Sequence, residues 1–154
     1  SDLTIRPFRP GDFPAIVAAA AQTGWEHLSP AEQALTNRED VAQRAYRQTV
    51  QALSMPSICF VAEERGQVVA YELVVLRPDE TSGIVEALKL DGWVHPAYRG
   101  RGLNRYMHQA GEDWCRARGI RRMVSVVAAH NHASLRATEK AGFETVRVIR
   151  AKWL

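Results

Sequence analysis

One strand–helix–strand step constrains the fold of this chain more than any other part of its sequence. Ile84–Val94 is predicted to form a strand, and Leu103–Arg118 carries apolar side chains at spacings of three and four residues, which indicates an amphipathic helix. Arg122–Ala128 is largely apolar on both faces, as in a strand buried beneath helices. A step of this kind places its two strands side by side and parallel, joined by a right-handed crossover.

Apolar periodicity and turn residues define the other elements. We expect further strands at Leu3–Phe8, Ser57–Glu64, Val68–Leu76 and Phe143–Lys152, and helices at Phe13–Thr23, Ser29–Leu53 and Ala133–Ala141. Short turns join the three middle strands into an antiparallel meander. The order β-α-α-β-β-β-α-β-α-β predicts an α+β (mixed α/β) fold with a mixed, mostly antiparallel central sheet and helices on both faces.

Local signals predict where the first helices begin and end. Asp12 is expected to be the N-cap of the first helix, and Gly24 is expected to end it. Ser29–Glu32 has the pattern of a capping box with proline in the first turn. A break in the helical sequence is expected near Thr36.

The composition bounds the class of protein. The 154 residues, of which 46% are hydrophobic and 24% charged, fit one globular domain over residues 1–154. No apolar run approaches the roughly 20 residues of a membrane span, so we expect no transmembrane segment and no membrane partner. No signal peptide is visible, and Cys59 and Cys115 lie among apolar neighbours as buried free thiols would. These features predict a cytoplasmic protein.

The charge balance narrows the choice of ligand. The formal net charge is +3, which permits an anionic ligand but does not indicate nucleic acid. Arginines crowd two short segments, yet aromatic residues do not interleave with them as in single-strand binders. We therefore expect no nucleic-acid partner.

The segment Val94–Asn104 carries the strongest chemical signal. It joins the end of a strand to the start of a helix through Arg99-Gly100-Arg101-Gly102. Free backbone N–H groups, the positive end of a helix and two arginines together favour a phosphate or another anion. The spacing fits neither a dinucleotide fingerprint nor a P-loop. The alternative is a loop with two glycines and a solvated charge cluster.

Two motifs in this order resemble the GNAT superfamily of N-acetyltransferases over essentially the whole chain. Arg99–Leu103 looks like the pyrophosphate loop of that family, R/Q-x-x-G-x-G/A, and Val94–Tyr98 matches its usual lead-in. Asn131–Phe143 is close to the second motif, N-x-A-S-x-R-x-x-E-K-x-G-F. The resemblance implies an enzyme that moves the acetyl group of acetyl-CoA to a primary amine, by direct attack in a ternary complex.

The resemblance also implies where acetyl-CoA binds. In the family the cofactor lies where two parallel strands splay apart, here the strand ending near His95 and the strand at Val124–Ala128. On this mapping, the candidate cofactor-binding residues are Trp93 and Val94 for pantetheine, Arg99, Gly100, Arg101, Gly102, Leu103 and Asn104 for the pyrophosphate, and Asn131 on the opposite wall. Asn104 is a departure, because the family pattern has glycine or alanine there.

The resemblance suggests two candidate catalytic residues. Asp91 lies on the cleft strand where the family often places a carboxylate base; the alternative is a surface carboxylate at a strand end. Thr138 replaces a tyrosine that many members use as the acid, so Ser134 becomes the candidate proton donor to sulfur. The alternative for Ser134 is a hydroxyl that caps the helix. No metal site is expected, because His130 and His132 lack a third ligand nearby.

The acceptor is expected to be a small-molecule or peptide amine, bound by the first helices and the loop between them. Glu26, Glu32, Glu39 and Asp40 are candidates to attract a cationic amine, or else form a solvated helix face. The chain has eleven residues after Phe143, without the further strand usual in the family. This favours a homodimer or strand exchange. The alternative function is an acyl-CoA-binding sensor or partner domain with little or no transferase activity.

Overall fold

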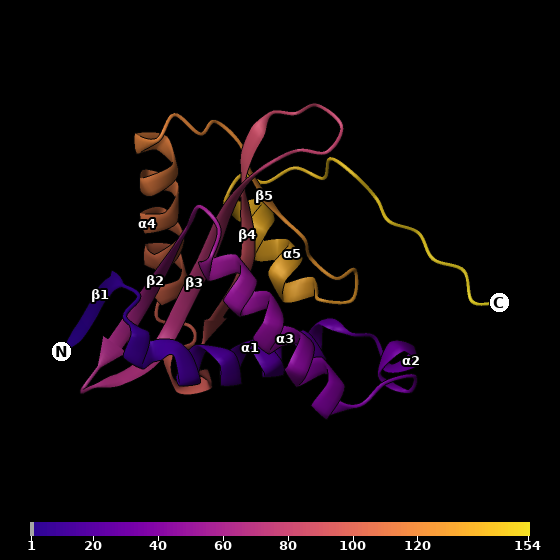
Figure 1. The fold of residues 1–154 in the computed structure, drawn as a ribbon, viewed down its shortest axis with the longest axis horizontal. Helices are drawn as coiled ribbons and strands as arrows, with labels where there is room; N and C mark the ends of the chain where they lie inside the picture. The colour runs from indigo at the N-terminus through magenta and orange to yellow at the C-terminus, as the bar shows by residue number, and fades with distance from the viewer. Residues whose placement is uncertain (1) are drawn as a thin grey trace.

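A five-stranded sheet of order β1-β2-β3-β4-β5 forms the centre of the molecule (Figure 1). The computed structural model describes residues 2–154. The strands are β1 (Leu3–Pro7), β2 (Ser57–Glu64), β3 (Gln67–Pro78), β4 (Val85–Val94) and β5 (Met123–Ser125). The first four are antiparallel neighbours, whereas β4 and β5 run parallel, which confirms the expected parallel pair.

Helices cover both faces of this sheet. They are α1 (Phe13–His27), α2 (Pro30–Gln33), α3 (Arg38–Leu53), α4 (Leu103–Ala117) and α5 (His132–Lys140), with 3-10 turns η1 (Pro10–Asp12) and η2 (Pro96–Tyr98). α1 and α3 pack on one face and α4 on the other. The α+β prediction with a mixed sheet is therefore confirmed. Among residues 2–154, no helix has both the length and the apolar character that a bilayer crossing requires.

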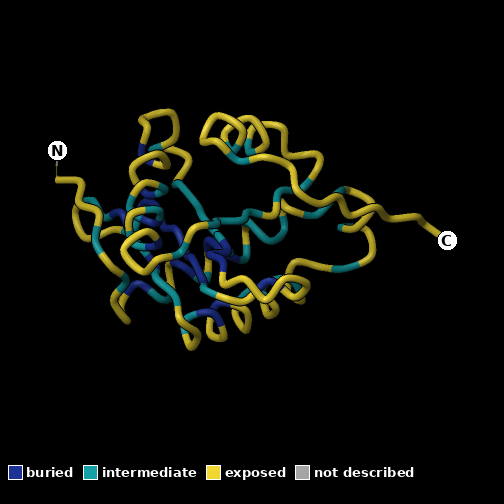
Figure 2. The backbone as a smooth tube through the Cα atoms, turned by 90° about the horizontal axis from the view of Figure 1, so that it is seen from above, coloured by how far each residue is buried: buried dark blue, intermediate teal, exposed yellow. Residues whose placement is uncertain are grey.

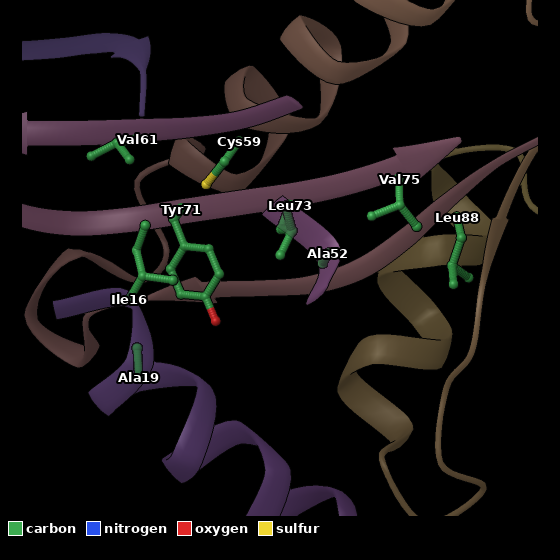
Figure 3. Packing of buried hydrophobic residues seen from close by; sticks show 9 residues of the cluster. All are labelled: Ile16, Ala19, Ala52, Cys59, Val61, Tyr71, Leu73, Val75 and Leu88. Atoms are coloured by element: carbon green, nitrogen blue, oxygen red, sulfur yellow. The ribbon is translucent and has the colours of Figure 1, made fainter. Parts of the chain in front are cut away.

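Alternating side chains of β3 build the two halves of the core. Tyr71 lies beside Ile16 of α1 and Leu73 beside Ala52 of α3, on the same face of the sheet (Figure 3). Ala70 lies on the opposite face with Met107 of α4. Figure 2 shows the buried backbone concentrated at the centre of the sheet and the C-terminal segment exposed. The alternation of β3 side chains, with Tyr71 and Leu73 on one face and Ala70 on the other, is the pattern expected of a strand covered on both sides.

The first helix begins at Phe13 with Asp12 at its N-cap position, as predicted, but it does not end at Gly24. The helix continues through Gly24 to His27, and a methyl group at Gly24 would lie at an ordinary contact distance of 3.4 Å from Val41 Cγ1 of α3. The carboxylate of Asp12 makes no capping bond to α1. It accepts two hydrogen bonds of 2.8 Å from Arg6 and one of 2.7 Å from the Arg9 N–H.

The next helices begin where the sequence predicts. Ser29 and Glu32 form the reciprocal capping box at the start of α2. The helical sequence then breaks, and Asn37 caps α3 by accepting a hydrogen bond from the Asp40 N–H at 2.9 Å. The buried free thiols of Cys59 and Cys115 are also found.

The C-terminal part differs most from the prediction. β5 comprises only three residues, and no strand forms over Phe143–Lys152. Instead the Phe143 ring packs beside His108 of α4, with ring centroids 5.4 Å apart, and Arg147 pairs with Asp79 at 2.9 Å. These contacts tie the segment to α4 and to the β3–β4 turn, so it does not lie along β5.

Gly111 lies where α4 crosses the sheet beside the buried Glu72. A methyl group at Gly111 would come within 2.9 Å of Glu72 Oε2. Gly111→Ala is expected to lower the free energy of unfolding by about 1–2 kcal/mol, because overpacking outweighs the gain in helix propensity. Urea unfolding measures this loss. Gly11→Ala is the matched control, since a methyl group there would meet nothing within 4 Å. Equal urea midpoints for the two variants would contradict the close contact between Gly111 and Glu72.

Candidate active site

An irregularity in β4 sets the direction of Asp91. Leu73 pairs with Asp91 but Val74 pairs with Lys89, so Leu90 is an extra residue on β4. Without this bulge Lys89 and Asp91 would share a face. With it, Lys89 lies on the α4 side, 3.3 Å from the carboxylate of Glu72, whereas Asp91 lies on the side of α1. The bulge therefore turns Asp91 toward the cleft described next.

β4 and β5 separate just beyond their paired segment. Pairing covers only Ala87–Lys89 against Met123–Ser125. β4 continues to Val94, so the edge of its last residues that faces β5 is left without a strand in the part of the chain that the structure describes. Such a backbone edge accepts an extended ligand by the hydrogen bonding of a sheet. The splay expected at a cofactor cleft is present.

A cleft of about 1310 Å³ occupies this gap. α1 and α3 contribute one wall and α5 another, and the cleft extends to the loop before α4. Ten of the eleven predicted site residues line it: Asp91, Trp93, Val94, Arg99, Gly100, Gly102, Leu103, Asn104, Asn131 and Ser134. The side chain of Arg101 does not, because it stacks over the Tyr98 ring at 5.0 Å.

The loop before α4 offers unused hydrogen-bond donors. Gly100 and Gly102 have φ angles of 77° and 74°, a conformation that favours glycine. Within residues 2–154, the backbone N–H groups of residues 100–104 donate to no backbone carbonyl. Arg99 donates its Nε–H to the carbonyl oxygen of Val94 at 3.0 Å, which fixes the loop against the end of β4. Free amides at the start of a long helix fit the phosphates of a nucleotide cofactor.

Asp91 is held by three donors. The Tyr71 hydroxyl donates to Oδ2, while the Thr23 hydroxyl lies 3.1 Å and the Gly92 N–H 2.9 Å from Oδ1. Burial nevertheless raises the pKa of Asp91 above its ordinary value, against the opposing effect of these hydrogen bonds. Burial and the neighbouring Asp91 also raise the pKa of Tyr71, so its phenol stays protonated. A carboxylate with a raised pKa in a cleft is suited to accept a proton.

Sequence reasoning did not identify Tyr71. It pairs with Trp93 across the strands and reaches Asp91 diagonally, so the contact depends on the register and the bulge. The period of two along β3 would have placed Tyr71 on the face of Leu73, but nothing in the sequence shows which β4 residue lies beside it.

α5 presents its N-terminal residues to the cleft. Asn131 caps the helix by accepting a hydrogen bond from the Ser134 N–H at 3.1 Å. The Thr138 hydroxyl is bonded to the backbone carbonyl oxygens of Ser134 and Leu135, at 2.9 and 3.0 Å. Among the side chains of residues 2–154, no group of three or more metal-ligating residues is arranged to hold a metal ion.

The acids proposed to attract an amine have mostly other roles. Only Glu26 of the four lines the cleft. Glu32 accepts from the Ser29 N–H at 3.0 Å, and Asp40 accepts from the Asn37 side chain at 3.2 Å. These two carboxylates stabilise helix starts and do not form an acceptor pocket.

Removing the Tyr71 hydroxyl is expected to shift the pH dependence of any reaction in which Asp91 accepts a proton. Its hydrogen bond to Asp91 lowers the pKa of that carboxyl, so Tyr71→Phe raises it further. The acidic limb of the kcat profile should then move to higher pH, by roughly one unit. Rates measured from pH 5 to 9 test this, with Tyr46→Phe on α3 as the control outside the cleft lining. If the acidic limb of the profile stays at the same pH, the Tyr71 hydroxyl does not influence the group whose protonation limits the rate.

Comparison with known proteins identifies both a matching family and a shared fold. A family model described as the Acetyltransferase (GNAT) family matches residues 21–143. The chain is similar in structure to a Pyrococcus furiosus protein assigned as an acetyl transferase, with a TM-score of 0.83 and 21% identity over 99% of each chain. A comparison with curated protein sequences finds no match.

Two further structures illustrate the range of similar proteins. An aminoglycoside 6′-N-acetyltransferase of Acinetobacter baumannii superposes with a TM-score of 0.72 and 22% identity, over 99% of this chain and 98% of that one. A Clostridium acetobutylicum protein described as a predicted acetyltransferase and solved with acetyl-CoA gives a TM-score of 0.73 and 17% identity, over 99% of this chain and 94% of that one. At these identities the structures show a shared fold. Since the family model covers most of the sequence, the chain belongs to the Acetyltransferase (GNAT) family.

Proposed function

We propose that this protein moves the acetyl group of acetyl-CoA to a primary amine by direct attack in a ternary complex. The observation that carries the proposal is a single cleft that joins the free amides before α4 to the partly buried Asp91. One end suits phosphates and the other can accept a proton from an amine. The similar Clostridium acetobutylicum protein, solved with acetyl-CoA, supports the choice of cosubstrate.

The residues present fit acetyl-CoA along the length of the cleft. The amides of residues 100–104 would hold the pyrophosphate, and the unpaired edge of β4 at Trp93 and Val94 would bind pantetheine as a strand binds its neighbour. The side chain of Asn131, at the start of α5, would contact the pantetheine from the wall of the cleft opposite β4. Positioning of the thioester beside Asp91 is then the main contribution to the rate.

The chemistry requires one proton to leave the amine and one to reach the sulfur. The neutral amine nitrogen bonds to the thioester carbonyl carbon while its proton passes to Asp91, directly or through water. The backbone N–H near Trp93 stabilises the negative charge on the carbonyl oxygen. The C–S bond then breaks, and the Ser134 hydroxyl donates a proton to the thiolate and regains one from solvent.

Turnover tests this assignment. Acetyl-CoA and a panel of primary amines, including amino acids, peptides, polyamines and an aminoglycoside, are incubated with the protein, and both thiol release and the acetylated amine are followed. We expect at least one amine to give the two products in equal amounts. Binding of acetyl-CoA without acetylation of any amine would favour a sensor or partner domain, and would contradict the transferase.

We further propose that two copies of the chain associate through the C-terminal segment. Among residues 2–154, β5 has a neighbour on one side only. Beyond the Arg147–Asp79 pair, the segment extends away from the body (Figure 1) and exposes Val148, Ile149 and Trp153, which are 74%, 90% and 62% exposed. An apolar segment and an open strand edge complement each other when the segment of one copy pairs with the sheet of the other.

Deleting residues 148–154 is expected to convert the dimer into a monomer, because the deletion removes the exposed apolar side chains but keeps the Arg147–Asp79 pair. Light scattering after size exclusion measures the mass, and circular dichroism checks the fold. Replacing the exposed Arg150 by glutamine is the control for a change in the same segment. A full-length protein that is monomeric at tens of micromolar would contradict the association.

A further inference from the structure

The wall of the cleft beyond Asp91 is basic. Arg44 and Arg47 of α3 line it together with Gln48 and Gln51, at spacings that place them on neighbouring parts of one helix face. Arg77 of β3 lines it too. All three arginines are exposed, so their guanidinium groups are accessible to a ligand.

These arginines have no acidic partner within the described chain. Arg6, Arg116, Arg122 and Arg147 each form an ion pair, whereas Arg44, Arg47 and Arg77 form none among residues 2–154. Glu86 lies opposite Arg77 across the strands but pairs with Arg122 at 3.3 Å. The positive charge on this wall is therefore not neutralised from within the protein.

Acidic groups offset this charge only in part. Two carboxylates that form no ion pair among residues 2–154, Glu26 and Asp91, line the cleft against the three arginines. Lys89 adds no free charge, because it pairs with Glu72. Past Asp91 the cleft thus presents more positive than negative charge to an acceptor.

The register places the basic wall on the acceptor side of Asp91. The loop before α4 follows the end of β4 that pairs with Ala70, Asp91 pairs with Leu73, and Arg77 lies four residues further along β3. At about 3.3 Å per residue, Arg77 is roughly 13 Å from the level of Asp91, in the direction away from the phosphate loop. When the amine of the acceptor lies at Asp91, a group a few bonds from that amine would reach the space between Asp91 and Arg77.

We propose that the acceptor amine carries an anionic group, a carboxylate or a phosphate, that binds to Arg44, Arg47 and Arg77. This inference rests on the proposed function and specifies its substrate class. Arginine donors suit both anions, whereas a polycationic amine such as an aminoglycoside would be repelled by the same wall. The chain would then differ in substrate from the aminoglycoside acetyltransferases whose fold it shares.

Bisubstrate conjugates test this without requiring turnover. CoA is joined through its sulfur and an acetyl bridge to the nitrogen of 4-aminobutyrate, butylamine or putrescine, which differ in the charge of the far end. Calorimetry gives the Kd of each conjugate and of CoA. We expect the carboxylate conjugate to bind about tenfold more tightly than the ammonium conjugate at low salt, with the neutral one between them. A fourth conjugate with a phosphonate end distinguishes the two anions.

Matched variants locate the effect. In Arg44→Gln/Arg47→Gln and in Arg77→Gln the difference between the carboxylate and ammonium conjugates should fall to about threefold or less, while CoA itself binds as before. Arg121→Gln removes an exposed arginine outside the cleft lining and should leave the difference unchanged. Equal or tighter binding of the ammonium conjugate, or a preference that survives in both cleft variants, would overturn the inference. Failure of CoA itself to bind would instead overturn the proposed function, and the inference with it.

Discussion

Asp91→Asn is expected to lower kcat by about 10²- to 10⁴-fold while leaving the affinity for acetyl-CoA within about twofold. The variant keeps the size of the side chain and can still accept the Tyr71 hydrogen bond, but it cannot take a proton from the amine. Because burial raises the pKa of Asp91, the wild-type rate should fall as the pH drops through that raised value. This acidic limb should be absent from the residual activity of Asp91→Asn.

Steady-state kinetics from pH 5 to 9 and calorimetry with acetyl-CoA measure the two parts of this expectation. Asp113→Asn is the control, since Asp113 lies on α4 outside the cleft lining and its carboxylate is exposed. Asp91 would be excluded as the base if Asp91→Asn kept kcat within threefold of the wild type and retained the acidic limb.

Gly102→Glu is expected to weaken acetyl-CoA binding by more than about 100-fold. The residue is the N-cap of α4, lies among the free amides and lines the cleft. A carboxylate there repels phosphate and occupies the space where the backbone would approach it. Nothing lies within 4 Å of the added Cβ, so the fold should persist despite the strain of a positive φ.

Gly66→Glu controls for that strain. Gly66 has a φ of 78° and open space around an added Cβ, but it lies in the β2–β3 turn outside the cleft lining. Both variants should unfold at similar urea concentrations, whereas only Gly102→Glu should lose acetyl-CoA. Equal affinities would show that the phosphates bind elsewhere.

The fold was predictable because its decisive signals are local. The amphipathic pattern of α4, the glycines before it and the capping box of α2 each lie within a few residues. A helix between two apolar strands then leaves little choice of topology. The phosphate loop follows from the same segment, since its chemistry depends on neighbouring backbone groups.

The features that the sequence did not predict depend on register and on tertiary contacts. The bulge at Leu90 decides which face Asp91 occupies, yet the sequence pattern of the strand does not reveal that a bulge is present. The Tyr71–Asp91 contact depends on that bulge. The segment after Phe143 alternates as a strand would, but its course follows the Arg147–Asp79 pair. Two of the four acidic residues assigned to the acceptor, Glu32 and Asp40, instead stabilise helix starts. The basic face of α3 became visible only in the folded chain.

Calorimetric titration with acetyl-CoA, with ATP and NADH as controls, tests the central claim most directly. The cleft at the separation of β4 from β5 should bind acetyl-CoA at one site per chain with micromolar affinity, and more tightly than either control. Pantetheine, which the controls lack, accounts for the difference because it alone can pair with the free edge of β4. No binding of acetyl-CoA, or equal binding of all three nucleotides, would contradict the assignment of this cleft.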